Sequence, residues 1–418
     1  MSSLKLGRYD YATYYANIGY ACCSLVIPLV LVDMGADLDF PLDDGGMGIA
    51  GTLHVFRSIA MLATLLTSGA IAVRIGKRHT VGVSMAMMGL GITVAALSNN
   101  FWFLVPCVIF SSLGEGAFEG IATPFVNDLH KPEPDAYVSI AHSFWSVGTV
   151  TVVLVTCALS AAGCSWRPIL GAAGLMALSS SIPYLIRENP SCKYPETPPE
   201  KMKGSVWQMT VDICKSFRFW LYCLAMAIGA GGEFGLTFWS ASFIRLSFLE
   251  SVWAGALGTA GIGIGMFLGR VIFGRLVPPR HFFTLLLTTS LLGVPLSMSL
   301  LLLRPEMFTS TALMMTALVL MLTACGVCVS AFWPMLQLYG VVRLPHLDST
   351  LLFIYFSSTG IPGCGIFTWL MGYLGDRFSD LRVAFLVVPS SMLLYALILL
   401  FDRFCLKQPV GAPAARQE

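Results

Sequence analysis

Long apolar runs separated by short polar segments make up most of the chain. A helix that crosses a bilayer needs about 20 mostly apolar residues, and twelve segments satisfy this. They are 10–33, 46–73, 80–98, 101–129, 137–161, 166–187, 216–246, 251–276, 281–303, 308–339, 349–374 and 380–404. The pattern predicts an all-α integral membrane protein with twelve transmembrane helices.

The longest polar connector lies near the middle of the chain. The stretch ENPSCKYPETPPEKMKGS (188–205) divides the spans six and six. It predicts two six-helix half-bundles, with these boundaries: N-terminal half 1–187, cytoplasmic linker 188–215, C-terminal half 216–404 and cytoplasmic tail 405–418. Glycines spaced four residues apart predict close helix packing in both halves: Gly116 and Gly120, then Gly261, Gly265 and Gly269.

Composition supports a membrane protein and excludes other classes. The chain is 56% hydrophobic and 11% charged, with a mean hydropathy of +0.76, whereas soluble domains are about 25% charged. The net charge of +2 is too small to indicate nucleic acid as a partner. Most of the cysteines lie in apolar runs, and no Cys/His cluster has zinc spacing. We therefore expect no metal and no cofactor.

The distribution of basic residues predicts the orientation. With the N-terminus inside, most Lys and Arg residues, Arg270 among them, fall in segments on the cytoplasmic side. The opposite side carries Arg167, Arg245, Arg304, Arg377 and Arg382. The positive-inside rule then places both termini in the cytoplasm of a multi-pass protein of the inner or plasma membrane.

A few ionisable residues fall inside the spans, where a charge costs several kcal/mol unless it is paired or hydrated. They are His54, Arg57, Glu115, Glu119, His142 and Glu233. At 1.5 Å per residue, Arg57 lies about 25 Å and Glu115 about 22 Å from the inner end of their spans. The two side chains can form an ion pair if these spans face each other. Such a pair could also simply neutralise itself and lock the N-terminal half.

Glu119 lies one helical turn beyond Glu115, and its only basic neighbour of matching depth is His142. A carboxyl group in a low-dielectric cavity can load and unload a proton as solvent access changes sides. We therefore predict that Glu119 carries the coupling proton. The alternative is a permanently protonated, hydrogen-bonded side chain without a role in coupling.

Aromatic and amide side chains inside the spans suggest a solute with a flat apolar face and hydroxyl groups. They are Tyr14, Asn17, Trp145, Trp239, Trp333 and Gln337. A sugar ring places its C–H face on an aromatic plane, and its hydroxyls bind amides and carboxylates. Each aromatic taken alone is equally well explained by the lipid-interface belt or by core packing.

Four stretches of the chain carry a family resemblance. They are FEGIATPFVNDL (118–129) with AHSFWSVGTV (141–150), GAGGEFGLTFWSASF (229–243), GMFLGRVIFGRL (265–276) and STGIPGCGIFTWLMGYLGDR (358–377). The chain resembles the major facilitator superfamily, and within it the fucose permease-like branch of sugar:proton symporters. The resemblance implies that Glu119 is the coupling acid of the fourth span. It also implies that His142 occupies a ligand-contacting position and that Glu233 is the acid of the seventh span.

Departures from the branch pattern affect the mechanism. The first span has Tyr14, Tyr15 and Asn17 but no acid at its centre, which argues against coupling through two acids. In GAIAVRIGKR (69–78), Val73 stands where the loop signature of the family has Asp. Ser111–Ser112 replaces the Arg typical of the fourth span. The glycine-proline motif of antiporters is absent from the fifth span, which favours import over export.

These observations predict a secondary active transporter rather than an enzyme. It would move a small polar solute, most simply a monosaccharide, by alternating access with H⁺ symport, as a monomer in the lipid bilayer. Proton coupling would involve Glu119, Glu115 and Arg57. The solute would contact Tyr14, Asn17, His142, Trp145, Glu233, Trp239, Trp333 and Gln337.

Two other functions remain compatible with the sequence. One is a proton-coupled exporter of drug-like or amphipathic compounds, which the aromatic content permits. The other is a non-transporting membrane sugar sensor, although the central loop and the tail are too short for a folded signalling domain. An enzyme is disfavoured because no Ser/His/Asp set or nucleotide-binding loop is present; GIGIGMFLGR (261–270) lies within a span and follows no strand.

Overall fold

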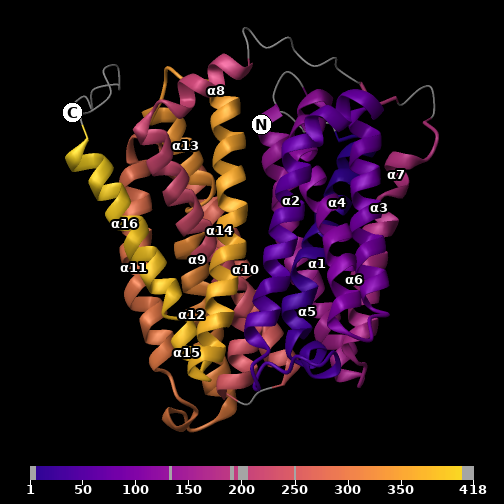
Figure 1. The fold of residues 1–418 in the computed structure, drawn as a ribbon, viewed down its shortest axis with the longest axis vertical. Coiled ribbons are helices and arrows are strands. Elements are labelled where there is room, and N and C mark those ends of the chain that lie inside the picture. The colour runs from indigo at the N-terminus through magenta and orange to yellow at the C-terminus, as the bar shows by residue number, and fades with distance from the viewer. Residues whose placement is uncertain (1–5, 131–133, 189–192, 196–205, 249–250, 407–418) are drawn as a thin grey trace. The chain divides into compact units, whose positions relative to one another are not determined.

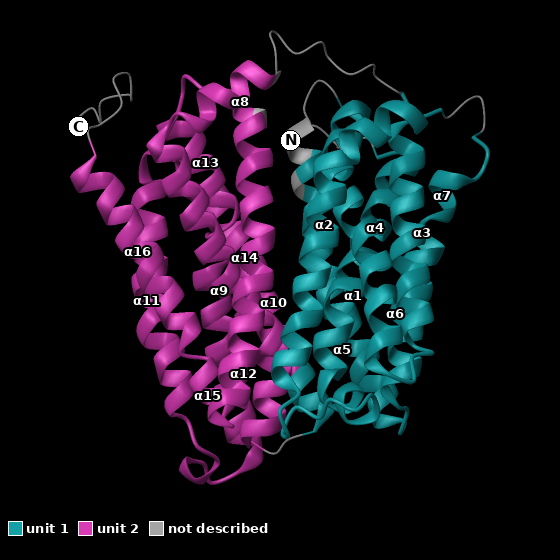
Figure 2. Cartoon of the chain, in the orientation of Figure 1, with its two compact units in different colours: residues 1–200, 251–256 teal, residues 201–250, 257–418 magenta. Residues whose placement is uncertain are grey.

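The computed structural model describes residues 6–130, 134–188, 193–195, 206–248 and 251–406 (Figure 1). The chain divides into two compact units, drawn in different colours in Figure 2. Unit 1 comprises 1–200 with 251–256, and unit 2 comprises 201–250 with 257–418. Half of the predicted linker (188–215) and nearly all of the predicted tail (405–418) lie outside the described residues.

Unit 1 contains six long helices and a short seventh. They are α1 (Arg8–Asp37), α2 (Met47–Ile75), α3 (Lys77–Ala95), α4 (Phe101–Leu129), α5 (Pro134–Ala161), α6 (Trp166–Ser180) and α7 (Ile182–Leu185). Helix α1 packs against α5 and α6, and α4 packs against α2 and α3. Between α2 and α3 the chain turns at Gly76, whose φ of 84° favours glycine. The start of α1 and α7 lie at the same end of the unit (Figure 1), where Arg8 binds the Pro183 carbonyl.

Unit 2 holds the remaining elements, except that the first residues of α10 (252–256) fall in unit 1. They are α8 (Val206–Cys214), α9 (Phe217–Phe248), α10 (Val252–Leu276), η2 (Pro279–His281), α11 (Phe282–Leu302), η3 (Pro305–Met307), α12 (Thr311–Val329), α13 (Pro334–Arg343), α14 (Ser349–Phe378), α15 (Leu381–Ala384) and α16 (Val387–Cys405). Helix α9 packs against α14 and α16. The sequence predicts one continuous helix over 308–339. In the structure this helix is interrupted at 330–333, because Pro334 has no backbone N–H to donate the hydrogen bond that would continue α12 into α13.

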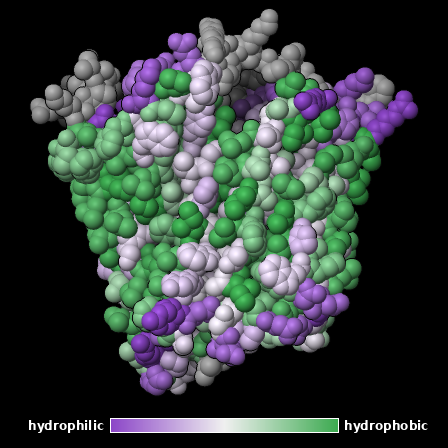
Figure 3. All heavy atoms as spheres, viewed as in Figure 1, coloured by the Kyte–Doolittle hydropathy of each residue, from purple (hydrophilic) through white to green (hydrophobic). Residues whose placement is uncertain are grey.

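The twelve-helix membrane fold is confirmed. Eleven segments among the described residues are long and apolar enough to cross a bilayer. The remaining predicted span coincides with α3, whose 19 residues extend about 28 Å at 1.5 Å each. On the face drawn in Figure 3, hydrophobic residues cover the middle of the helices and hydrophilic residues gather at their ends. This is the distribution that a bilayer requires.

The predicted glycine rows do mark close helix packing. A Cβ added at Gly116 of α4 would lie 2.0 Å from the Met61 carbonyl oxygen of α2. A Cβ at Gly265 of α10 would lie 2.0 Å from the Thr323 carbonyl oxygen of α12. Both distances are far below van der Waals contact, so only glycine allows these backbones to approach so closely.

Candidate functional site

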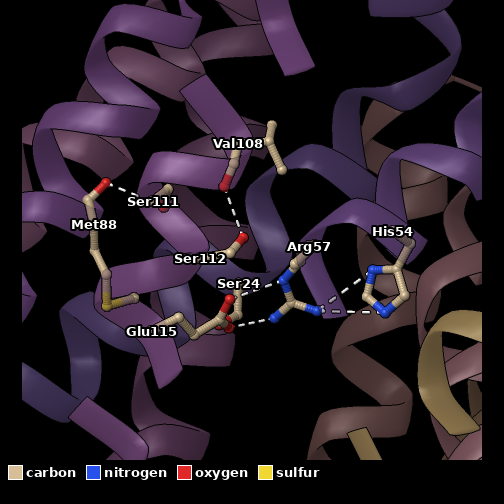
Figure 4. A network of polar contacts seen from close by, with 8 residues as sticks. All are labelled: Ser24, His54, Arg57, Met88, Val108, Ser111, Ser112 and Glu115. Carbon is tan, nitrogen blue, oxygen red and sulfur yellow. Dashed lines mark hydrogen bonds and ion pairs between the residues drawn. The ribbon is translucent and has the colours of Figure 1, made fainter. Parts of the chain in front are cut away.

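An ion pair between a buried carboxylate and a partly buried guanidinium joins α2 to α4 in unit 1. The side chain of Arg57 donates through Nε to Oε2 of Glu115 at 2.9 Å, and through Nη2 to Oε1. The Ser24 hydroxyl of α1 donates to the same Oε1 (Figure 4). Glu115 is 3% exposed. The ion pair that the depths predict is therefore present, and it is bidentate, the geometry in which an Arg–carboxylate pair is strongest.

His54 completes the surroundings of the guanidinium. It lies one turn before Arg57 on α2, is buried, and has its ring nitrogens 3.4 Å from Arg57 Nη1 (Figure 4). The nearby hydroxyls of Ser111 and Ser112 donate to backbone carbonyls. The resulting charge arrangement is one guanidinium facing one carboxylate, with an imidazole on its other side.

Glu119 lies one turn further along α4 and has different surroundings. Its side chain is half-buried and faces the Tyr20 hydroxyl of α1. Among the described residues, no basic side chain forms an ion pair with it. His142, which the sequence suggests as its neighbour, instead has Nε2 3.0 Å from the Thr123 hydroxyl. Glu119 therefore faces a neutral phenol hydroxyl, whereas Glu115 forms an ion pair with a guanidinium cation.

Sequence reasoning did not identify Tyr20 or Ser24, because a hydroxyl inside an apolar run is unremarkable by itself. Their four-residue separation was the available signal. It equals the separation of Glu115 and Glu119, so two donors on one helix can meet two acceptors on its neighbour.

The predicted solute-contacting residues of unit 1 differ in their surroundings. Tyr14 is buried and stacks flat on Phe144, with ring centroids 4.3 Å apart. Asn17 is buried and donates to the Thr13 carbonyl at 2.9 Å, while Trp145 is half-buried on α5. A gap between α1, α4 and α5, too narrow for a water molecule, is lined by Thr13, Asn17, Ala122, Thr123, Val126, Val138, Ala141 and His142. The structure thus brings Asn17 and His142 to one place and packs Tyr14 into the core.

Unit 2 contains its own buried acid. Glu233 of α9 is 7% exposed and accepts a hydrogen bond from Arg270 of α10 at 3.2 Å. The sequence places Arg270 among the basic residues on the cytoplasmic side, which stays a prediction; in the structure the residue lies in α10 and pairs with this acid. The second carboxylate oxygen of Glu233 is buried and has no hydrogen-bond partner within the described part of the chain.

The other predicted contacts of unit 2 differ in burial and in their hydrogen bonds. Trp239 is fully buried, and its indole N–H donates to the Thr368 carbonyl of α14 at 3.0 Å. It packs in the core of unit 2, and its contact with solute stays a prediction. Gln337 is buried and donates to the Ser357 hydroxyl at 2.8 Å. Trp333 is half-buried at the break between α12 and α13.

The chemistry available at these sites is proton exchange and hydrogen bonding. Within the described residues, no group of three or more His, Cys, Asp or Glu side chains is arranged to hold a metal ion. The polar atoms of unit 1 come from α1, α2, α4 and α5, and those of unit 2 from α9 and α10. Ionisable side chains at such depth generally indicate a solute or ion pathway.

Comparisons with known proteins place this fold. No curated protein sequence matches the chain significantly. Solved structures match it over almost its whole length. A nucleoside transporter superimposes with a TM-score of 0.72 at 14% identity, covering 94% of this chain and 98% of its own. A D-xylose–proton symporter gives 0.69 at 12% identity, with coverages of 94% and 96%. The E. coli fucose:proton symporter gives 0.61 at 16% identity, with coverages of 96% and 98%.

A family model extends these similarities to the sequence itself. The model of the Major Facilitator Superfamily matches residues 16–365. The match runs from within α1 into α14 and so includes both units and all the buried ionisable residues described above. The chain belongs to the Major Facilitator Superfamily.

Proposed function

We propose that this protein is a secondary active transporter that imports a small hydroxylated solute, a monosaccharide, by alternating access with H⁺ symport. Membership of a transporter family, together with structural neighbours that are transporters, supports transport rather than enzymatic catalysis. The names of the three neighbours refer to a nucleoside, D-xylose and fucose, and two of them name a proton. At 12–16% identity these neighbours share the fold, so the solute class stays a proposal.

One observation carries the assignment of proton coupling. Unit 1 holds two acids one turn apart, and they differ in what they face. Glu115 is matched by Arg57 in a bidentate pair, so protonating it would break a buried ion pair at a cost of about 3–5 kcal/mol. Glu119 is half-buried and faces the neutral Tyr20 hydroxyl. Of the two acids, Glu119 can gain and lose a proton with the smaller rearrangement.

In this proposal the pair of Arg57 and Glu115 braces the N-terminal half, while Glu119 loads and unloads H⁺. The contacts to the solute come from Asn17, His142 and Trp145 in unit 1, and from Glu233 with Gln337 and Trp333 in unit 2. Glu233 suits this role because one of its carboxylate oxygens is buried without a partner among the described residues. A carboxylate oxygen in that state gains most from a hydroxyl donor.

The test is transport by the purified protein in proteoliposomes. Counterflow with D-xylose, L-fucose and uridine identifies a working solute, because exchange requires no net proton movement. Accumulation of that solute under an imposed pH gradient is then compared between the wild type, Glu119→Gln and a matched control. The control is Glu306→Gln, which changes an exposed acid of η3.

Glu119→Gln is expected to keep counterflow and to lose accumulation driven by the pH gradient, whereas Glu306→Gln keeps both. Accumulation by Glu119→Gln at the wild-type level would overturn the assignment of Glu119. Wild-type accumulation that does not respond to the pH gradient would overturn proton symport itself.

A further inference from the structure

Two of the proposed solute contacts of unit 2, Trp333 and Gln337, lie where α13 packs against α14. Gln337 donates to the Ser357 hydroxyl of α14 at 2.8 Å. The ring of Trp333, the residue that precedes α13, packs against Gly360 of α14. Numbers rise along α13 as they fall along α14, so the two helices are antiparallel and the two contacts are in register. Both residues therefore lie on the face of α13 that meets α14.

Gly360 leaves the space that the Trp333 ring fills. A Cβ added at Gly360 would lie 2.7 Å from Cζ3 and 2.8 Å from Cη2 of Trp333. These two atoms form the outer edge of the indole, so the ring occupies the volume that a side chain at residue 360 would need. Carbon atoms pack at about 3.5–4.0 Å, so a methyl group at this position would displace the ring by about 1 Å.

This contact differs from that of the next glycine of α14. A Cβ at Gly363 would lie 2.2 Å from the Ala227 carbonyl oxygen of α9, so two backbones meet there. At Gly360 the two nearest atoms belong to the far end of a side chain, and a ring can move by rotation about its χ angles. Gly363 therefore allows two helices to approach each other, whereas Gly360 determines where the Trp333 ring lies.

The ring has one direction in which it can move. Trp333 lies at the interruption between α12 and α13 and is half-buried. Met226 of α9 lies on the same side of the ring as Gly360, with its Cγ 3.2 Å from the added Cβ. A ring displaced from α14 would therefore move toward its exposed side, which in the proposed function contacts the solute.

We propose that Gly360 is a specificity-determining residue that sets the size of the sugar which the protein accepts. It acts through the position of the Trp333 ring and does not touch the solute itself, so it is a positioning residue. This inference rests on the proposed function, because it takes Trp333 to be a contact of a sugar. A larger side chain at residue 360 reduces the space beside the indole, and a smaller ring at residue 333 increases it.

The experiment compares sugars that differ by one methyl group. D-Xylose and 6-deoxy-D-glucose have the same configuration of ring hydroxyls, and the second carries a methyl group at C5. D-Arabinose and L-fucose form a second pair of this kind. Counterflow in proteoliposomes gives kcat/KM for both members of the pair that the wild type exchanges. The ratio within this pair is then measured for Gly360→Ala, Trp333→Phe and the double variant.

The two single variants should change the ratio in opposite directions. Gly360→Ala should shift it toward the pentose by about tenfold, the lower end of the discrimination that one methylene provides in an apolar pocket. Trp333→Phe shortens the ring and should shift the ratio toward the methylated sugar. The double variant should lie between them, because the smaller ring leaves room for the alanine methyl. A general loss of stability would lower both values of kcat/KM and leave their ratio unchanged.

Two glycines provide matched controls. A Cβ at Gly340 of α13 would lie 2.6 Å from Cε2 of the fully buried Phe356, so Gly340→Ala also crowds an aromatic ring between α13 and α14. A Cβ at Gly274 of α10 meets nothing within 4 Å. Both variants should keep the wild-type ratio. A shift of the ratio by Gly340→Ala equal to that by Gly360→Ala would overturn the assignment to Gly360.

A second measurement needs no solute. The purified full-length protein is labelled with 7-fluorotryptophan, which leaves Cζ3 and Cη2 unsubstituted, and the fluorine resonance of Trp333 is identified by its absence in Trp333→Phe. Gly360→Ala should shift this resonance, and Gly274→Ala should not. An unshifted resonance in Gly360→Ala would show that Gly360 does not position the ring.

The two measurements separate failure of this inference from failure of the proposed function. A shifted Trp333 resonance with an unchanged sugar ratio would overturn the specificity role of Gly360 and leave sugar transport in place. A wild-type protein that exchanges neither sugar of either pair would overturn the proposed function, and with it the specificity role.

Discussion

At the scale of single residues, the two acids of α4 differ in the side chains that they contact and not in their own chemistry. Glu115 and Glu119 are chemically the same and one turn apart. Glu115 is held by Arg57 and Ser24, whereas Glu119 meets Tyr20. In the proposed function the ion pair makes Glu115 a structural group, whereas Glu119, which no described residue neutralises in this way, exchanges the proton. The division of labour proposed here depends on this contrast.

The structural role of the pair leads to a stability prediction. Glu115→Gln removes the carboxylate that faces the partly buried guanidinium of Arg57, and should lower the free energy of unfolding by about 3–5 kcal/mol. The double variant Arg57→Met with Glu115→Gln removes both charges of the pair and should recover most of this loss. Equilibrium unfolding of the detergent-solubilised protein measures both. A double variant less stable than Glu115→Gln would show that Arg57 has a further essential partner.

At the scale of helices, small residues set how closely the elements pack. In unit 1 the packing glycine is Gly116, where α4 meets α2; in unit 2 it is Gly265, where α10 meets α12. With lipid as solvent, helices associate through close backbone contact more than through hydrophobic burial. The glycine rows therefore fix the helix pairs that carry the buried charges.

Gly265 and Gly274 of α10 form a matched pair for a packing test. A Cβ at Gly265 collides with the Thr323 carbonyl, while a Cβ at Gly274 meets nothing within 4 Å. Gly265→Ala should therefore destabilise the protein by about 1–3 kcal/mol through overpacking. Gly274→Ala should be neutral, or stabilising by up to about 1 kcal/mol from helix propensity. Thermal unfolding of the two variants measures this difference in stability. Equal midpoint temperatures would contradict the close contact between Gly265 and the Thr323 carbonyl.

At the scale of the whole molecule, the distribution of Lys and Arg predicts which end of each unit faces the cytoplasm. Labelling three of the cysteines can test this orientation. Cys405 ends α16 and Cys214 ends α8, and both are exposed. Cys164, which lies between α5 and α6, is half-buried. The positive-inside orientation places the first two inside and the third outside.

A membrane-impermeant maleimide applied to intact cells tests this orientation. Variants that retain only one of the three cysteines are compared before and after permeabilisation. The Cys164 protein should react in intact cells, and the Cys405 and Cys214 proteins only after permeabilisation. The reverse pattern would invert the predicted topology and would place the His130–Asp10 pair outside.

The sequence predicts the elements of this protein well, because each span is a local property. About 20 apolar residues must form a helix in lipid, since every backbone polar group needs a partner there. The spans, the family and the glycine contacts of Gly116 and Gly265 followed from such patterns. The ion pair of Arg57 and Glu115 also followed, because depth along a helix can be counted in residues.

What the tertiary structure decided is how each helix is rotated about its axis and which neighbour it faces. That rotation brings Tyr20 to Glu119, aligns Asp10 with His130, and pairs Arg270 with Glu233. It also turns Trp239 into the core against Thr368. Each of these helices carries apolar residues on most of its sides. The sequence therefore shows no periodicity that distinguishes the face packed against other helices from the face toward lipid. The chain by itself determined how many helices there are and at what depth the charges lie; only packing between distant segments decided which charges and hydroxyls meet.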